Sequence, residues 1–214
     1  MLLSQNPEQN MLFDDTYRTI EKPAEGLFRD RGSKFLAFAY PLNNEGELKE
    51  ILAGLKAAHP KANHHCWAFR LGIDRSVFRI NDDGEPSGTA GRPILNNLLS
   101  KDLTNIVVIV IRYFGGTLLG VPGLINAYKS ATEDAISQAV IVQKTVNDVY
   151  IIKFDYLQMN EVMKIIKEDE LTIISQDFDT ECSINVAVRK TLVNLVLGRL
   201  DKINGVTVKY ERTV

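Results

Sequence analysis

The chain has 214 residues, of which 45% are hydrophobic and 24% charged, and its formal net charge is −2. These values are typical of a globular protein with room for one large domain or two small ones. The nearly balanced charge excludes a generally basic nucleic-acid coat, so any contact with nucleic acid has to come from a local patch.

Two cysteines, Cys66 and Cys182, stand far apart in the sequence. Two thiols do not make a disulfide framework, and such a count is typical of proteins in a reducing cytoplasm. The amino-terminal segment lacks the basic region and apolar core of a secretory signal. No apolar run approaches the roughly 18 residues that span a bilayer. We therefore expect a soluble, cytoplasmic protein.

Hydrophobic periodicity predicts a first part made of strands and helices with short connections. The expected strands are 16–21, 26–30, 33–40, 63–71, 76–81 and 105–113, and the expected helices are 45–59, 93–100 and 124–139. The clearest helical stripe lies in 45–59, where apolar residues recur at i, i+3, i+4 and i+7: Leu48, Ile51, Leu52 and Leu55. Because few residues separate the elements, we expect a sheet with helices packed on it.

After Lys144 a second pattern begins. The expected strands are 149–156, 171–178, 181–188 and 206–212, and the expected helices are 160–168 and 190–202. The order βαββαβ is the split βαβ or ferredoxin-like pattern. We therefore predict an α+β fold with two domains, an amino-terminal α/β sandwich at 14–144 and a ferredoxin-like domain at 145–214.

A glycine-rich segment, Arg112–Tyr128, joins the apolar strand to the following helix. Its glycines are Gly115, Gly116, Gly120 and Gly123. Free backbone N–H groups in such a loop, together with the positive end of the helix dipole, suit an anionic ligand. The alternative is that the glycines only permit tight turns, since their spacing matches neither a P-loop nor a dinucleotide fingerprint.

A second long polar loop, 82–91, precedes the helix expected at 93–100. Its acidic side chains, Asp82, Asp83 and Glu85, could bind a divalent cation or act as a general acid or base. The alternative is a scaffold role, with an Asx-type turn followed by a helix cap from Ser87 or Thr89. Both interpretations stay open, although long structured loops are often functional.

Arg92 and Arg112 stand beside these two loops. Together with Lys34 they could form a local cationic site for phosphate. Aromatic surfaces near such a site would come from Trp67, Tyr113 and Phe114. A nucleotide or an RNA backbone would suit that mixture. The alternative, which we favour for Phe114, is that the aromatic side chains belong to the core.

The segment Asn63–Trp67 holds two histidines and a cysteine. On a strand, His64 and Cys66 share one face while His65 and Trp67 take the other. Zinc would need further ligands from elsewhere, so no metal is expected. A nucleophilic pair of Cys66 with a histidine is also disfavoured, because adjacent strand positions rarely place sulfur against imidazole. We expect Cys66 to be a buried small apolar residue, with the histidines at the rim.

Three segments together resemble the IMPACT/YigZ family. They are Asn63–Ala68, Asp82–Pro93 and Arg112–Tyr128, and they occur in the family's order. The resemblance covers roughly residues 16–140 as an IMPACT-type amino-terminal domain, and the βαββαβ unit resembles the small ferredoxin-like domain of bacterial members. It implies a ribosomal-protein-like fold for the first domain and a likeness of the second to the last domain of the translocating elongation factor. Eukaryotic relatives restrain a stress-activated kinase that targets an initiation factor, by competing for its activator protein.

This chain departs from the family pattern at three places. Relatives usually carry a lysine at the position of Leu118 and an arginine at that of Asn126, and they often read Gly-Ala-Gly-Gly where this chain has Gly120–Gly123. Two cations are thus missing, and Pro122 has no N–H to offer. These departures weaken the expectation of an anionic ligand for this chain.

These features predict a non-enzymatic, translation-associated regulator that binds RNA, the ribosome or a translation-factor partner, without a cofactor or a metal. The predicted ligand-binding or anion-binding residues are Lys34, Asp83, Glu85, Ser87, Thr89, Arg92, Arg112, Gly115, Gly116, Gly120 and Gly123. The alternative is an enzyme of hydrolase or phosphotransfer type that acts on a small anionic substrate at Asp82, Asp83 and the glycine-rich loop. The oligomeric state stays open.

Overall fold

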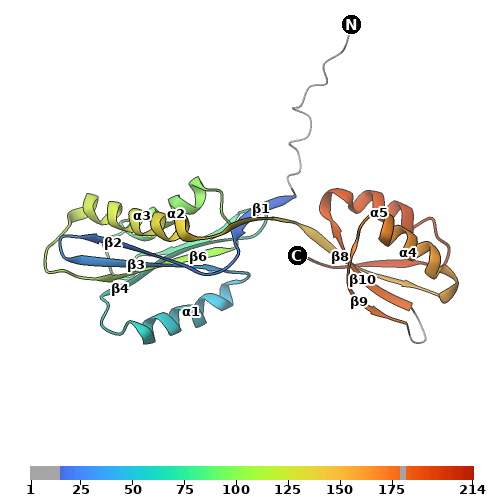
Figure 1. Ribbon diagram of the computed structural model, residues 1–214, viewed down its shortest axis with the longest axis horizontal. Coiled ribbons are helices and arrows are strands. Elements are labelled where there is room, and N and C mark those ends of the chain that lie inside the picture. Colours follow the sequence, from blue (N-terminus) through green and yellow to red (C-terminus); the bar gives the residue numbers. More distant parts are fainter. Residues whose placement is uncertain (1–14, 179–181) are drawn as a thin grey trace, which may run out of the picture. The chain divides into compact units, whose positions relative to one another are not determined.

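The computed structural model describes residues 15–178 and 182–214 and divides the chain into two compact units (Figure 1). The first unit is Tyr17–Lys144, and the second is Thr145–Val214 with Asp15 and Thr16. Each unit has its own sheet, helices and core. This confirms the predicted α+β class, with an amino-terminal sheet and helices and a separate carboxyl-terminal sheet and helices.

A five-stranded antiparallel sheet forms the centre of the first unit. Its strand order is β2 (Ala24–Asp30), β3 (Ser33–Pro41), β6 (Ile106–Tyr113), β4 (His64–Leu71) and β5 (Val77–Asn81). β6 takes the middle because its run of β-branched residues is buried on both faces of the sheet. The end of β6, where the glycine-rich loop begins, is therefore held by strands on both sides.

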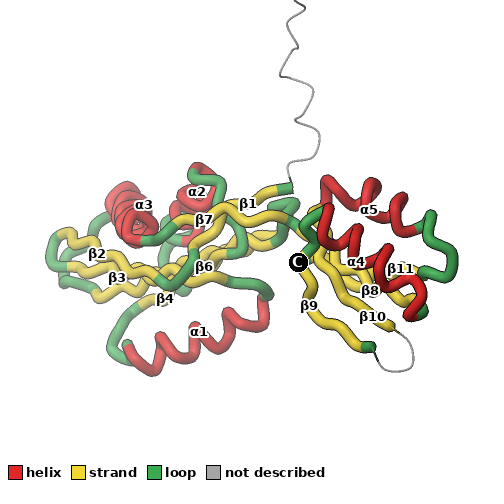
Figure 2. The backbone as a smooth tube through the Cα atoms, turned by 45° about the vertical axis from the view of Figure 1, so that its right-hand side comes forward, coloured by secondary structure: helices red, strands yellow, loops and turns green. Residues whose placement is uncertain are grey.

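Helices cover both faces of this sheet. Figure 1 and Figure 2 show α1 (Glu45–Ala58) on one face and α2 (Gly91–Ser100) and α3 (Gly120–Gln138) on the other. Side chains alternate between the faces along β3, so Phe35 packs in the α2–α3 core and Phe38 in the α1 core. The first unit therefore has two cores, one on each side of the sheet.

α3 packs closely on β2 because Gly26 has no side chain. A Cβ atom at Gly26 would lie 2.2 Å from the backbone N of Ala135 in α3. No real Cβ contact is that short, so the helix could not keep this position over a larger residue. A single glycine thus sets the distance between helix and sheet.

The structure differs from the sequence prediction at the start of α3 and in the segment that follows it. The helix begins at Gly120 rather than at 124, since Pro122 lies in the first turn, where its missing N–H has no intrahelical acceptor to lose. After the helix, β7 (Ile141–Thr145) pairs with β1 (Thr16–Ile20) in a separate two-stranded sheet. The sequence prediction lacked β7, because its partner stands far earlier in the chain and its own five residues are mostly exposed.

The second unit has the βαββαβ order of a ferredoxin-like fold. In chain order its elements are β8 (Asn147–Phe154), α4 (Met159–Glu168), β9 (Thr172–Asp177), β10 (Cys182–Arg189), α5 (Val193–Leu200) and β11 (Thr207–Thr213). Short 3₁₀ turns, Tyr156–Gln158 and Lys190–Leu192, lead into the two helices. The strands pair antiparallel in the order β11-β8-β10-β9, and α4 and α5 pack on one face. The strand expected at 181–188 begins at Cys182, and residue 181 lies outside the described residues.

Asp15 is a buried carboxylate that binds the end of β10. It accepts hydrogen bonds from Arg189 Nε at 2.7 Å, Arg189 Nη2 at 2.8 Å and Thr191 Oγ1 at 2.6 Å. These contacts, above all the hydrogen bonds from Arg189, hold the pKa of Asp15 well below its usual value. The ionised carboxylate therefore stabilises the folded second unit.

We expect Asp15→Asn to lower the free energy of unfolding of the second unit by about 1–2 kcal/mol at pH 7, since charge-assisted hydrogen bonds are lost but Arg189 is half exposed. Because the folded pKa lies below the unfolded value, this stabilisation is present above about pH 4 and is lost as the pH falls toward the folded pKa. Urea denaturation followed by circular dichroism should therefore show a smaller difference between wild type and variant at pH 3. Asp201→Asn, at an exposed position, is the control. An equal difference at both pH values would contradict the prediction.

Candidate binding recess beside the glycine-rich loop

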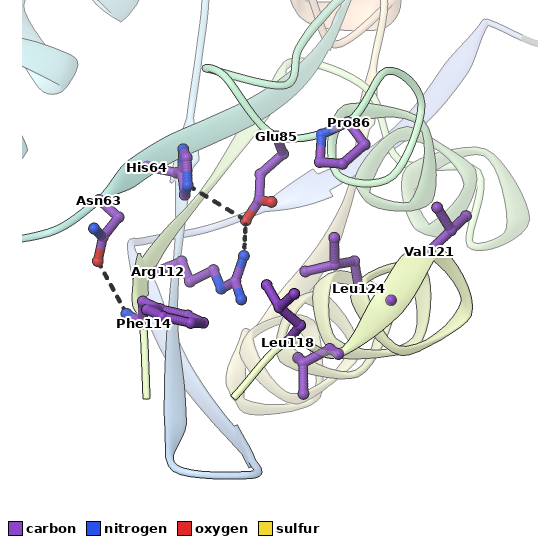
Figure 3. Close-up of a pocket in the computed structure, with 11 residues that line it drawn as sticks. Asn63, His64, Glu85, Pro86, Arg112, Phe114, Leu118, Val121 and Leu124 are labelled. Carbon is purple, nitrogen blue, oxygen red and sulfur yellow. Dashed lines mark hydrogen bonds and ion pairs between the residues drawn. The ribbon is translucent and has the colours of Figure 1, made fainter. Parts of the chain in front are cut away.

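A recess with a volume of about 460 Å³ lies beside the start of the glycine-rich loop (Figure 3). Three segments that are distant in the sequence line it, and the lining residues are Asn63, His64, Glu85, Pro86, Arg112, Phe114, Leu118, Leu119, Gly120, Val121 and Leu124. The segments are the start of β4, the loop before α2, and the chain from the end of β6 into α3. The structure thus brings together the three motifs that carry the family resemblance.

A buried ion pair forms the floor of the recess. Arg112 Nη1 donates to Glu85 Oε1 at 2.6 Å, and the Tyr128 hydroxyl donates to the same oxygen at 2.8 Å. Glu85 is only 8% exposed and Arg112 only 5%, so both charges are compensated inside the protein. Arg112 therefore does not offer an uncompensated positive charge to a phosphate.

Two aromatic rings hold the guanidinium group of Arg112 in place. Its Cζ lies 5.5 Å from the ring centroid of Phe35 and 5.4 Å from that of Phe114, distances typical of cation–π contacts. Phe35 is fully buried, whereas Phe114 is 45% exposed at the rim of the recess. The expectation of Phe114 as a core residue is wrong, because the chain leaves the sheet after Tyr113 and turns the ring outward.

His64 presents a ring nitrogen to the recess. Its Nδ1 lies 2.8 Å from the backbone carbonyl oxygen of Asp83, and this contact requires the proton to be on Nδ1. Nε2 lies 3.9 Å from Glu85 Oε1 and is a hydrogen-bond acceptor in the neutral ring. The neutral imidazole therefore adds an acceptor beside the ion pair.

Cys66 lies fully buried on the same face of β4 as His64. Its Sγ donates its one proton to the carbonyl oxygen of Asp82 at 3.0 Å and lies 3.3 Å from the hydroxyl oxygen of Tyr128. Burial raises the pKa of the Cys66 thiol and of the Tyr128 hydroxyl, so both stay protonated at neutral pH. The expectation of Cys66 as a buried small residue is confirmed. Cys66 thus contacts Tyr128, whose hydroxyl in turn binds Glu85 at the floor of the recess.

Asp82 fixes the polar loop and caps α2 from a distance. Its carboxylate accepts three backbone N–H groups at 2.8, 3.0 and 2.8 Å, those of Gly88, Ala90 and Gly91. The last two N–H groups stand at the start of α2, where no intrahelical acceptor exists. The predicted cap from Ser87 or Thr89 is wrong, because the Thr89 hydroxyl donates to the Pro86 carbonyl instead.

Of the residues predicted for the site, Glu85, Arg112 and Gly120 line the recess. The others stand outside its lining: Lys34, Asp83, Ser87, Thr89, Arg92, Gly115, Gly116 and Gly123. Lys34 pairs with Tyr113 on the α1 side of the sheet, the face opposite to Arg112. Arg92 is exposed on α2 and lines a separate groove of about 470 Å³ between α2 and α3.

The glycines of the loop have structural reasons to be glycine. A Cβ atom at Gly115 would lie 2.0 Å from the carbonyl carbon of Gly32, and the Gly115 N–H donates to Ser33 Oγ at 3.1 Å. Gly116 and Gly120 have φ angles of +85° and +71°. The tight-turn interpretation is supported, and the N–H group of Gly115 is already bound.

The apolar rim of the recess does not follow from the sequence alone. Next to Phe114, the side chains of Leu118 and Val121 are 80% and 52% exposed. The available signal was the pair of large apolar residues inside a turn-rich segment, where a core residue is not expected. It became visible only once the loop was placed over the end of β6.

Among the described residues, no three His, Cys, Asp or Glu side chains gather closely enough to hold a metal ion. In the same part of the chain, no helix combines the length and apolar character needed to cross a membrane.

The sequence comparisons with known proteins indicate one family. The Impact N-terminal domain matches residues 31–136. The Escherichia coli IMPACT family member YigZ is 32% identical over 158 residues, which are 73% of this chain and 78% of YigZ. The crystal structure of a hypothetical protein matches 94% of this chain and 99% of its own length, with 26% identity and a TM-score of 0.71. A structure of the two-domain translational regulator Yih1 matches 65% of this chain and 53% of its own at 27% identity, but its TM-score of 0.35 is too low to support an inference. With this identity to YigZ over most of both proteins, the chain belongs to the IMPACT family.

Proposed function

We propose that this chain is a non-enzymatic, translation-associated binding module that engages a protein partner through the recess and its rim. The observation that carries the proposal is a ring of exposed apolar side chains, Phe114, Leu118 and Val121, around a floor whose charges compensate each other. Exposed apolar side chains that gather around a concave site are typical of interaction surfaces. The link to translation is the one that the family resemblance implies.

A protein partner suits this surface better than an RNA backbone does. Phosphate groups bind where positive charge is uncompensated, whereas Arg112 is paired with Glu85 and Lys34 lies on the other face of the sheet. The positions at which relatives usually carry cations are Leu118 and Asn126 in this chain. The other cations that line a groove of the first unit are Arg92 and Lys129, between α2 and α3, where Lys129 lies 3.7 Å from Glu133 Oε1.

The contacts of the candidate catalytic side chains favour binding over catalysis. Both carboxylate oxygens of Asp82 accept backbone N–H groups, and Asp83 Oδ2 accepts the N–H of His65 at 2.6 Å. Cys66 is buried with a raised thiol pKa, which makes it a poor nucleophile. The structural contacts of Asp82, Asp83 and Cys66 are therefore enough to account for these side chains, and no catalytic role is needed.

The proposal is tested by co-sedimentation of the purified chain with purified Escherichia coli ribosomes at 50 and 200 mM KCl. We expect binding that weakens less than about tenfold with salt, because apolar contacts release few counterions. Leu118→Glu should weaken binding at least about tenfold, since it places a charge on the apolar rim. Leu195→Glu, on an exposed apolar residue of the second unit, is the matched control and should bind normally.

Two results would contradict the proposal that this protein partner belongs to the ribosome and binds through the apolar rim. Absence of ribosome binding even at 50 mM KCl would reject a ribosomal partner. Binding that falls by about three orders of magnitude or more with salt would indicate RNA. In that case the variant Arg92→Ala/Lys129→Ala should lose binding and Leu118→Glu should keep it.

A further inference from the structure

The floor of the recess carries one hydrogen-bond acceptor and one donor that the protein leaves unused. Both hydrogen bonds to Glu85 go to Oε1, so Oε2 has no donor within residues 15–178 and 182–214. Arg112 uses Nη1 for the ion pair, while Nη2 makes no hydrogen bond to the described residues and Nε is buried without an acceptor. Figure 3 shows the second oxygen of Glu85 and the outer edge of the guanidinium group facing the recess. A ligand thus meets a carboxylate oxygen beside an N–H group.

The charge of this floor selects against charged ligands. An anion in the recess would lie against Glu85, and a cation would lie against Arg112, so neither could recover its hydration energy. A neutral group with an N–H and a C=O side by side can satisfy both unused positions. In the neutral ring, His64 Nε2 offers a further acceptor for a second N–H.

The walls of the recess require an apolar neighbour for that group. Leu118, Val121 and Leu124 line one side, and Phe114 lies beside Arg112 at the rim. A volume of about 460 Å³ is at the lower end of small-ligand sites and holds one or two amino-acid residues. The lining thus combines a small polar contact area with a larger apolar one.

We infer that the recess recognises a primary carboxamide, the side chain of an Asn or Gln residue that the protein partner presents next to an apolar side chain. The inference rests on the proposed function, because it names the chemistry of the group that the partner inserts. The carboxamide N–H donates to Glu85 Oε2, its C=O accepts from Arg112 Nη2, and the apolar side chain packs on Leu118 and Phe114.

The test compares two small probes that differ only in the polar group. The full chain, labelled with ¹⁵N, is titrated at pH 7 with N-acetyl-leucinamide, which is neutral, and with N-acetyl-leucine, which carries a carboxylate. We expect the amide to bind at least about tenfold more tightly, with chemical-shift changes confined to His64, Glu85 and the segment 112–124. Equal binding, a preference for the carboxylate, or no saturable binding of either probe would overturn the inference. Saturable binding of uridine in preference to the amide would overturn it in favour of a nucleobase.

Two variants test the polar and the apolar contacts separately. Glu85→Gln removes the negative charge, leaves Arg112 uncompensated, and should reverse the preference toward the carboxylate. Leu118→Ala should weaken both probes to the same extent, and its exposed position makes it safe for folding. If Glu85→Gln does not fold, the ratio of the affinities for the amide and the carboxylate, measured in wild type and in Leu118→Ala, still tests the inference.

The failure of this inference and that of the proposed function look different. If Leu118→Glu loses ribosome binding while the two probes bind equally, the interaction surface stands and the carboxamide is wrong. If Leu118→Glu binds ribosomes as wild type does, the surface itself is rejected, whatever the probes show.

Discussion

Replacing Arg112 by methionine is expected to lower the free energy of unfolding of the first unit by about 3–5 kcal/mol. Methionine preserves much of the volume between Phe35 and Phe114, but it leaves the carboxylate of Glu85 buried without its positive partner. Uncompensated burial of one charge costs far more than the pair contributes when it is intact. Urea denaturation followed by the fluorescence of Trp67, the single tryptophan of the chain, measures the change.

Two further variants identify the cause of this loss. Arg92→Met makes the same substitution at an exposed position of α2 and should change stability by no more than about 0.5 kcal/mol. The double variant Glu85→Gln/Arg112→Met removes the isolated charge and should recover at least about 1 kcal/mol relative to Arg112→Met. If Arg112→Met is as stable as Arg92→Met, the ion pair does not have the role that its burial indicates.

Gly26→Ala is expected to destabilise the first unit by about 3 kcal/mol or more. The new methyl group would meet the backbone of Ala135, which cannot turn aside as a flexible side chain would. α3 would have to move away from β2, and this would open the core beneath it. Thermal unfolding and urea denaturation of the purified variant measure the loss.

Gly54→Ala is the matched control for this substitution. Gly54 lies inside α1, and a Cβ atom there would meet nothing within 4 Å. Alanine should therefore stabilise the helix by about 0.5–1 kcal/mol. Opposite signs for the two variants would separate the packing effect from the intrinsic effect of the glycine-to-alanine change. A neutral Gly26→Ala would show that α3 can shift without cost.

Much of the fold follows from local patterns in the sequence. The stripe of Leu48 and Leu55 predicts α1, the apolar run before Arg112 predicts β6, and the rhythm after Lys144 predicts the second sheet with its two helices. β7 was not predicted, because its partner β1 is more than a hundred residues away in the sequence and local patterns do not reveal such a pairing. The cap of α2 was not predicted for a similar reason. Asp82 binds the first N–H groups of the helix from a distant position in the preceding loop, and local capping rules consider only the residue next to the helix.

The site was predictable in its residue types but not in its geometry. Lys34 and Arg112 lie on opposite faces of the sheet because of the register between β3 and β6. The composition of the chain does not reveal this register. Arg112 looks like a free cation until Glu85, from another loop, is placed against it. Leu118 is noticeable in the sequence only as a leucine where relatives usually carry a lysine, and its place at the rim depends on the turn that carries it.

The pairing of β1 with β7 has a topological consequence. Val146 N–H binds the carbonyl of Asp15 at 2.6 Å, and Glu21 N–H binds that of Val140 at 2.9 Å, so the two strands run antiparallel and hold the ends of the first unit together. The first unit is thereby an insertion within the second, entered after Thr16 and left before Thr145. Such an insertion can vary in length at little entropic cost to its host, because loop closure depends only weakly on loop size. The same adjacency of ends makes the first unit a natural subject for circular permutation, with new termini in one of its exposed loops.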